Sequence, residues 1–255
     1  MSLFAQKTSR IKPSQSVPSS ANRTQLLISV RNAVEANICV QAGVDWIDLK
    51  EPSAGPLGCQ TCHVAQQVHQ VLRGHARRSV ALGELSNLDR EQSILIGSLF
   101  PVAKVGLSHM NHDSRWSHQL AELSVDLAKT SCQLVPVIYA DWKSCSAPQP
   151  HQVLEWAIEN AAPKLLIDTY QKAGKRLMNH LSFEQLHDLV LQGQHSNVDI
   201  VLAGSVQAQD LPTLLALKCL AIGVRGAVCQ KSREGELDAQ LVLDWVEKFS
   251  STVSG

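Results

Sequence analysis

The feature that most constrains the fold is an alternation of a short apolar run, a polar turn and a longer helical pattern, which occurs eight times along the chain. The apolar runs are rich in β-branched residues, as is typical of strands that are buried on both faces. A helix between successive strands requires those strands to be parallel. The predicted strands cover residues 26–30, 46–50, 78–83, 102–106, 133–140, 164–168, 199–204 and 221–226. The predicted helices cover residues 32–41, 62–72, 90–99, 116–129, 152–160, 182–191, 210–217 and 238–249.

Eight strand–helix units in about 225 residues predict one closed (β/α)8 barrel, a TIM barrel, over residues 25–250. A doubly wound open sheet is the alternative. Such a sheet more often has fewer strands and a glycine-rich first turn, whereas the segment after the first predicted strand, SVRNAVE, has no glycine. Residues 1–24 are rich in serine and lack the apolar core of a secretory signal, so they are predicted to be a disordered tail, with an organelle transit peptide as the alternative.

Composition narrows the partners that such a barrel could have. Lys plus Arg and Asp plus Glu balance at 23 each, and aromatic residues make up only 4% of the chain, so neither nucleic acid nor a membrane surface is a predicted partner. No apolar run approaches the roughly 20 residues that a membrane helix needs. The seven cysteines, an odd number without an export signal, are typical of reduced thiols. We expect a cytoplasmic protein with a small-molecule partner; a homo-oligomer is compatible with the sequence.

Charged residues interrupt the predicted strands near their carboxyl ends, where TIM-barrel enzymes have their active sites. Asp48 and Lys50 alternate with apolar neighbours on the second strand, so both are expected to point into the barrel. Lys104 lies on the fourth strand and Asp168 ends the sixth. Because alternate strands contribute to the same layer of barrel side chains, these four residues are predicted to converge at the top of the barrel.

Two lysines and two aspartates at this place indicate amine chemistry. Burial and a second lysine nearby both lower the pKa of a lysine toward neutrality, while the carboxylates of Asp48 and Asp168 could keep one lysine charged and leave the other neutral. A neutral amine is a nucleophile that forms a Schiff base with a carbonyl. The alternative is a buried ion pair with a structural role only.

Small residues follow the last two predicted strands, in LAGS and GVRG. TIM barrels commonly bind a phosphate group there through backbone N–H groups. We therefore predict a phosphate site that consists of Gly204, Ser205, Arg225 and Gly226, with Arg225 as a charged contact. The alternative is that the glycines simply end their strands. Gly55 and Gly58, after the second strand, could serve a second anion or only shape a turn.

The segment CQTCH, residues 59–63, matches the pattern of covalent haem attachment. It lies where a helix is predicted to begin, and a zinc site would need a second pair of ligands that the scattered cysteines do not offer. Reduced thiols at a helix start are therefore the favoured interpretation. His109 and His112 could carry protons at the barrel mouth, although solvated loop histidines are more common; Glu84, which closes the third strand, is a better acid–base candidate.

Several motifs occur in the order found in one known family: LLISVRNAVEA, AGVDWIDLKEPSAGPLG, KVGL, YAD, LIDTYQKAGKRL, LAGSV and GVRGAVC. Together they resemble the (5-formylfuran-3-yl)methyl phosphate synthase family, from about Leu26 to Cys229. The resemblance implies a TIM barrel that condenses two molecules of glyceraldehyde 3-phosphate, with loss of one phosphate and two waters. It also implies that Lys50 forms the Schiff base and Lys104 accepts the proton, and that Asp168 and Lys172 match the family's D-T-x-x-K motif. No metal or organic cofactor is implied, because the imine is itself the electron sink.

The chain departs from the family pattern at three strand ends. Glu51 stands where the family usually has asparagine, Ser108 where it usually has tyrosine, and Glu84 where it tends to have aspartate. Glu51 could help to keep Lys104 or Lys172 charged. The departures at Glu51 and Ser108 keep open a class I aldolase that acts on another sugar phosphate. A third possibility is a barrel that binds phosphometabolites without catalysis.

Overall fold

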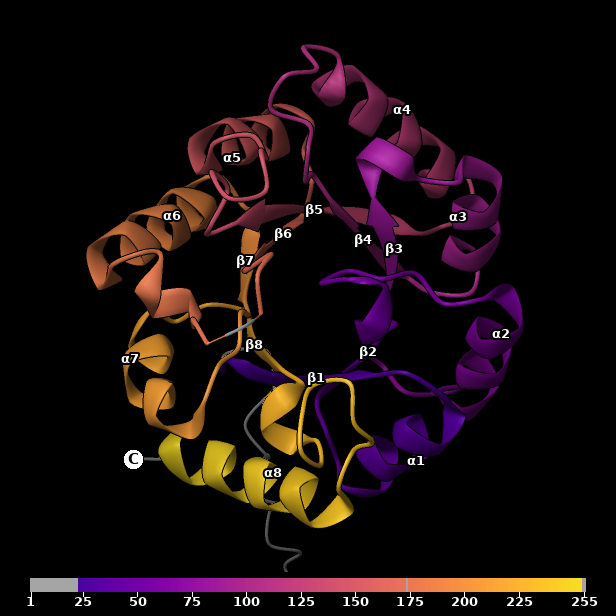
Figure 1. The fold of residues 1–255 in the computed structure, drawn as a ribbon, viewed down its shortest axis with the longest axis vertical. Coiled ribbons are helices and arrows are strands. Elements are labelled where there is room, and N and C mark those ends of the chain that lie inside the picture. The colour runs from indigo at the N-terminus through magenta and orange to yellow at the C-terminus, as the bar shows by residue number, and fades with distance from the viewer. Residues whose placement is uncertain (1–22, 173, 254–255) are drawn as a thin grey trace, which may run out of the picture.

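The computed structural model describes residues 23–172 and 174–253, and these form a closed barrel of eight parallel strands in chain order. Each strand pairs with the next, and β8 pairs with β1. Figure 1 looks down the barrel, with the strands around the centre and the helices in an outer ring. The predicted TIM barrel is confirmed. Of the tail predicted over residues 1–24, residues 1–22 lie outside the described part.

The helices and strands follow the predicted order. The strands are β1 (Gln25–Val30), β2 (Trp46–Leu49), β3 (Arg78–Glu84), β4 (Val102–Gly106), β5 (Gln133–Tyr139), β6 (Lys164–Asp168), β7 (Asp199–Leu202) and β8 (Ala221–Val224). The α-helices are α1 (Ala33–Gln41), α2 (Cys62–Val71), α3 (Arg90–Gly97), α4 (Trp116–Ala128), α5 (Pro150–Glu159), α6 (Phe183–His195), α7 (Leu211–Ala216) and α8 (Ala239–Val253). Short 3-10 turns are η2 (Pro52–Ala54), η3 (Leu85–Asn87), η4 (Leu177–Asn179), η5 (Ala208–Asp210) and η6 (Gly226–Val228). None of the helices described is long and apolar enough to cross a membrane.

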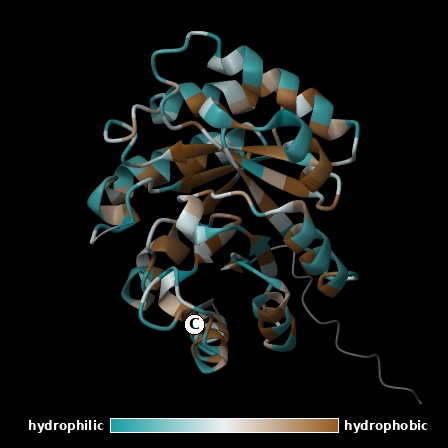
Figure 2. Cartoon of the chain, turned by 45° about the vertical axis from the view of Figure 1, so that its right-hand side comes forward, coloured by the Kyte–Doolittle hydropathy of each residue, from teal (hydrophilic) through white to brown (hydrophobic). Residues whose placement is uncertain are grey.

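The core has two parts, because strand side chains alternate between the barrel interior and the helix layer. The outer part packs the strands against the helices and includes Ile47 and Leu49 of β2. The inner part fills the barrel and includes Trp46 and Val135. In Figure 2 the strands at the centre are mostly hydrophobic, whereas the outward faces of the helices are mostly hydrophilic. The alternation on β2 leaves Asp48 on the inner face, as predicted.

Polar side chains fix the starts of several helices. The side chains of Asn32, Asp89 and Ser182 accept hydrogen bonds from backbone N–H groups in the first turns of α1, α3 and α6. Thr61 does the same for α2, whose first residue is Cys62 of the CQTCH segment. All seven cysteines are free thiols. The CQTCH segment therefore leads into a helix, as predicted.

Candidate active site

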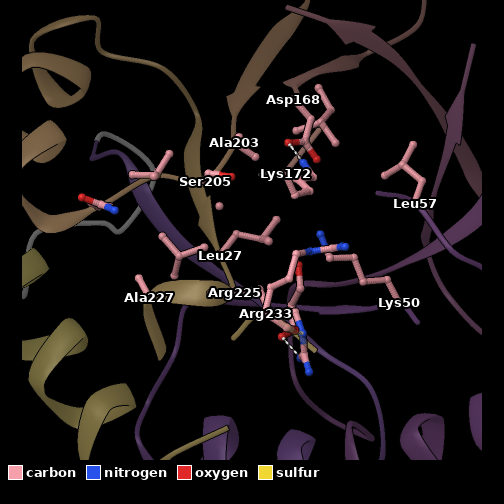
Figure 3. Close-up of a pocket in the computed structure, with 18 of the residues that line it drawn as sticks. Leu27, Lys50, Leu57, Asp168, Lys172, Ala203, Ser205, Arg225, Ala227 and Arg233 are labelled. Carbon is pink, nitrogen blue, oxygen red and sulfur yellow. Dashed lines mark hydrogen bonds and ion pairs between the residues drawn. The ribbon is translucent and has the colours of Figure 1, made fainter. Parts of the chain in front are cut away.

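A cavity of about 460 Å³ opens at the carboxyl ends of the strands. Eight residues that the sequence singled out line it: Lys50, Lys104, Asp168, Lys172, Gly204, Ser205, Arg225 and Gly226. Figure 3 shows several of them around this space, with Asp168 and Lys172 joined to each other. The ninth residue, Asp48, is not part of the lining; it is fully buried and contacts Lys104, which is. The convergence expected from the strand pattern is thus present in the fold.

Asp48 and Lys104 form a buried ion pair between β2 and β4, with 2.5 Å between Nζ and Oδ2. The sheet register places Ser29 and Ser79 beside Asp48 on the neighbouring strands, and both hydroxyls donate to its carboxylate, at 3.1 and 2.6 Å. A buried carboxylate with this many donors is fully satisfied. Asp48 therefore holds Lys104 at a fixed place in the barrel.

Asp168 and Lys172 form a second pair, also with 2.5 Å between Nζ and carboxylate oxygen. The same oxygen, Oδ1, accepts from the backbone N–H of Thr169 at 2.7 Å. Burial alone would raise the pKa of Asp168, but the charges of Lys172 and Lys50 outweigh it, so the pKa lies below its usual value. Asp168 is therefore held ionised. Asp141, in the YAD motif, accepts from the backbone of Tyr170 and Gln171 and so fixes the loop that carries Lys172.

Lys50 differs from the other two lysines. It is 8% exposed, and among residues 23–172 and 174–253 no carboxylate lies within 4.0 Å of its amine. The pKa of Lys50 is lowered from 10.5 to about 7, chiefly by burial. The charge of Asp168 opposes this shift, the charges of Lys172 and Lys104 add to it, and Asp48 opposes it more weakly. Near neutral pH a large fraction of Lys50 is therefore an uncharged amine, which can attack a carbonyl.

The loops after β7 and β8 form the opposite side of the cavity. Gly204 has a φ of +112°, and a Cβ at this position would lie 2.9 Å from Cγ2 of Thr169. Only glycine allows the chain to pass so close to the β6 loop. The backbone N–H groups of Ser205 and Gly226 have no acceptor within the described parts of the chain. They can therefore donate to an anion in the cavity.

Arg225 lines the cavity, but its charge is already paired. Its guanidinium donates to the carboxylate of Glu35, with 2.9 Å between Nη1 and Oε2, and both side chains are about 3% exposed. It also donates to three backbone carbonyl groups, those of Ser29, Arg233 and Gly235. The direct contact with phosphate predicted for Arg225 thus stays a prediction, and a ligand would have to compete with Glu35. The sequence reasoning missed Glu35, whose signal is the helix-start pattern Asn32-x-x-Glu35.

Glu84 lies at a second cavity beside the first, on a strand whose register shifts between Ala81 and Glu84. Its carboxylate accepts from the hydroxyl of Tyr139 at 2.5 Å and from the backbone N–H of Ser108 at 2.9 Å. Burial and then the Glu84 carboxylate raise the pKa of Tyr139 well above its ordinary value, so the phenol stays protonated. The sequence placed Glu84 and Tyr139 at the ends of the third and fifth strands, but it did not predict that the two side chains pair.

The remaining candidates lie outside this arrangement. His112 is exposed, and His109 packs against the ring of Tyr170 at the second cavity, 6.2 Å between ring centroids. Among the described residues no group of three or more His, Cys, Asp or Glu side chains is placed to hold a metal ion.

Comparison with known proteins decides the family. The sequence model of the family described as 4-HFC-P synthase matches residues 26–246, which is nearly the whole barrel. The chain belongs to this family. It is an enzyme family, and the matched range includes every residue of the cavity described above.

Proteins of methanogenic archaea are similar to this chain along most of their length. A protein of Methanopyrus kandleri named (5-formylfuran-3-yl)methyl phosphate synthase is 26% identical over 239 residues, which cover 89% of this chain and all of that protein. A protein of the same name from Methanothermobacter thermautotrophicus is 29% identical over 209 residues, which cover 80% of this chain and 89% of that protein.

Solved structures share the fold at low identity. Phosphoribosyl anthranilate isomerase from Thermus thermophilus superposes with a TM-score of 0.60 at 12% identity and covers 89% of this chain and 99% of its own. A 3-hexulose-6-phosphate synthase gives a TM-score of 0.59 at 11% identity, over 90% of this chain and all of its own. These similarities concern the barrel fold alone.

One departure from the family pattern has a different role from the one expected. The carboxylate of Glu51 accepts from Ser53 and from Gln60, at 2.6 and 2.8 Å, and lies 3.9 Å from Arg31. It therefore caps the η2 turn, and the expectation that it keeps Lys104 or Lys172 charged is wrong. Ser108, at a second departure, is fully buried, and its hydroxyl has no hydrogen-bond partner within the described residues.

Proposed function

We propose that this chain is a (5-formylfuran-3-yl)methyl phosphate synthase that joins two glyceraldehyde 3-phosphate molecules through a Schiff base on Lys50. The observation that carries the proposal is the contrast between Lys50, an unpaired buried amine with a pKa of about 7, and two lysines of the same cavity that are held by carboxylates. The names of the methanogen relatives support the choice of substrate. A cytoplasmic location remains part of the proposal, since triose phosphates are metabolites of that compartment.

In the proposed first step, Nζ of Lys50 attacks the aldehyde carbon of one substrate molecule, and water leaves to give an imine. Protonation of the imine makes the hydrogen on the adjacent carbon acidic. The ammonium group of Lys104 first passes a proton to Asp48 along their hydrogen bond, and the neutral amine of Lys104 then takes the proton from that carbon. The product of this step is an enamine.

The enamine carbon then attacks the aldehyde of the second substrate molecule and forms the new carbon–carbon bond. Elimination of one phosphate, loss of two waters and ring closure give the furan and release Lys50. Asp168 and Lys172 would supply and remove protons for the leaving groups, since they form a hydrogen-bonded acid–base pair at the cavity wall. Gly204, Ser205, Arg225 and Gly226 would border the retained phosphate. The imine is the electron sink, so no cofactor enters this scheme.

The proposal is tested by incubating the purified chain with glyceraldehyde 3-phosphate. We expect a furan absorbance in the ultraviolet, release of one phosphate per furan, and a product mass equal to two substrate molecules less one phosphoric acid and two waters. Borohydride added with the substrate should label the peptide that contains Lys50.

Lys50→Ala is expected to abolish both product and label, while Lys129→Ala, at an exposed lysine paired with Asp126, changes neither. Retro-aldol products without furan would replace the proposal with the aldolase alternative. A folded chain that yields no product and no label, yet binds the substrate, would instead be a binding protein.

A further inference from the structure

We propose that Arg233 is the cation that binds the substrate phosphate. Arg233 was not among the residues that the sequence indicated. The identity of the phosphate as part of a triose phosphate rests on the proposed function; the binding of a phosphate group at Arg233 does not.

Arg233 lies in a compact loop between η6 and α8. An antiparallel bridge between Cys229 and Leu237 closes this loop, and the backbone N–H of Gly235 donates to the carbonyl of Ser232 at 2.9 Å. A Cβ atom added to Gly226 would lie 3.5 Å from the Cβ of Arg233. The loop thus brings Arg233 to the cavity beside the phosphate-binding backbone predicted from the sequence.

The guanidinium of Arg233 reaches across the cavity mouth to the loop after β2. Nη1 donates to the carbonyl of Pro52 at 2.9 Å, and Nη2 donates to the carbonyl of Gly55 at 3.2 Å. These two bonds connect the β8 loop to the turn that follows Lys50. They use two of the five N–H donors of an arginine, so three remain for a ligand.

Charge pairing in the cavity points to the same residue. Lys104, Lys172 and Arg225 each have a carboxylate partner within 3 Å. Two other cations of the lining, Lys231 and Arg233, have none within 4.0 Å among residues 23–172 and 174–253, and of these Lys231 is exposed whereas Arg233 is partly buried. Burial lowers the pKa of Arg233 and Asp168 opposes this, so the guanidinium stays charged at neutral pH.

A phosphate monoester would supply the negative charge that Arg233 has no partner for, and its shape fits the guanidinium. The guanidinium presents parallel donors that fit two phosphate oxygens, and the N–H groups of Ser205 and Gly226 border the same cavity. Figure 3 shows Arg233 on the same side of the cavity as Arg225, with Asp168 and Lys172 facing them. A phosphate held there would keep the aldehyde of a three-carbon substrate inside the cavity that contains Lys50.

The test compares two aldehydes that differ only in phosphate. Borohydride trapping on Lys50 is measured as a function of the concentration of glyceraldehyde 3-phosphate or of glyceraldehyde. For Arg233→Ala we expect the concentration of glyceraldehyde 3-phosphate that gives half-maximal trapping to rise about 30- to 100-fold, because a charge-assisted bidentate contact is lost. The corresponding concentration of glyceraldehyde should change less than about twofold. The concentration for Arg233→Lys should lie between those of the parent and Arg233→Ala. Arg73→Ala, which removes an exposed arginine outside the cavity, should have the same concentration as the parent. An equal loss for both aldehydes would overturn the proposal and leave Arg233 with the loop contacts alone.

Inorganic phosphate separates this inference from the proposed function. Calorimetric titration of the parent and of Arg233→Lys, the variant more certain to fold, measures phosphate binding without any imine. Weaker binding to the variant supports the inference even if neither aldehyde is trapped, in which case only the proposed function fails. Equal binding to both proteins overturns the inference whatever the trapping shows.

Discussion

At the scale of single residues, three lysines in one cavity differ in chemistry because their partners differ. Lys104 and Lys172 each form an ion pair with a carboxylate, and at Lys172 burial lowers the pKa while the charge of Asp168 opposes that effect. Lys50 is buried with the same two carboxylates nearby but in contact with neither, and the two ammonium groups repel its own charge. One amine is thus selected for attack on a carbonyl by the pairing of its neighbours.

This selection predicts how Schiff-base formation depends on pH. Lys50 must be neutral to attack, and its pKa is about 7, so the initial rate of imine formation should rise about tenfold per pH unit below pH 7 and level off above it. The measurement is the mass label on the Lys50 peptide after brief exposure to substrate and cyanoborohydride between pH 5.5 and 9. A rate that keeps rising beyond pH 9 would show an amine with an ordinary pKa and contradict the selection.

At the scale of elements, the loops after the strands carry the chemistry, and their backbone conformation decides what they can hold. Gly83, with a φ of +100°, precedes Glu84 and accompanies the shift in strand register, so the carboxylate is turned toward Tyr139. Gly204 has a similar role after β7, where it lets the chain pass against Thr169. At the end of β3 and after β7, a glycine thus places a polar group, or a free N–H, at the mouth of the barrel.

The contact at Gly204 predicts a loss of stability on substitution. Gly204→Ala forces an alanine to a φ of +112° and places its Cβ 2.9 Å from Thr169, so we expect the free energy of unfolding to fall by about 2–4 kcal/mol. Gly74→Ala is the matched control, because Gly74 also has a positive φ, +84°, but no atom within 4 Å of an added Cβ. The control should lose only about 1 kcal/mol. Urea unfolding of both variants is the measurement, and equal losses would mean that the contact with Thr169 is unimportant.

The strands and their order could be predicted from the sequence, because hydrophobic runs and helical periodicity are local signals. β4 and β6 have the predicted bounds, and alternation along β2 correctly placed Asp48 and Lys50 inside the barrel. The pairing of side chains from distant loops could not be predicted in this way. Glu35 meets Arg225 across 190 residues of chain, and Arg233 meets Pro52 across 181.

At the scale of the whole molecule, the ion pair of Glu35 and Arg225 links the first and the last strand–helix units of the barrel. Glu35 lies in the first turn of α1 and Arg225 directly follows β8, so the pair joins the first unit of the barrel to the last. The Glu35 carboxylate also accepts from the backbone N–H groups of Arg31 and Leu237. One buried carboxylate therefore connects β1, β8 and the loop that carries Arg233.

Removing the charge of Glu35 is expected to destabilise the whole barrel, because it leaves a buried guanidinium without a counter-ion. For Glu35→Gln we expect a loss of about 3–5 kcal/mol in the free energy of unfolding. Since a midpoint shifts by roughly 2–4 °C per kcal/mol in a domain of this size, calorimetry should show a single transition that is about 6–20 °C lower. The double variant Glu35→Gln with Arg225→Met should recover part of this loss, because no unpaired charge is then buried. Arg90→Gln, which breaks the exposed pair with Asp126, is the control and should change the midpoint little. A Glu35→Gln midpoint equal to that of the control would mean that strand pairing between β8 and β1 closes the barrel without help from this ion pair.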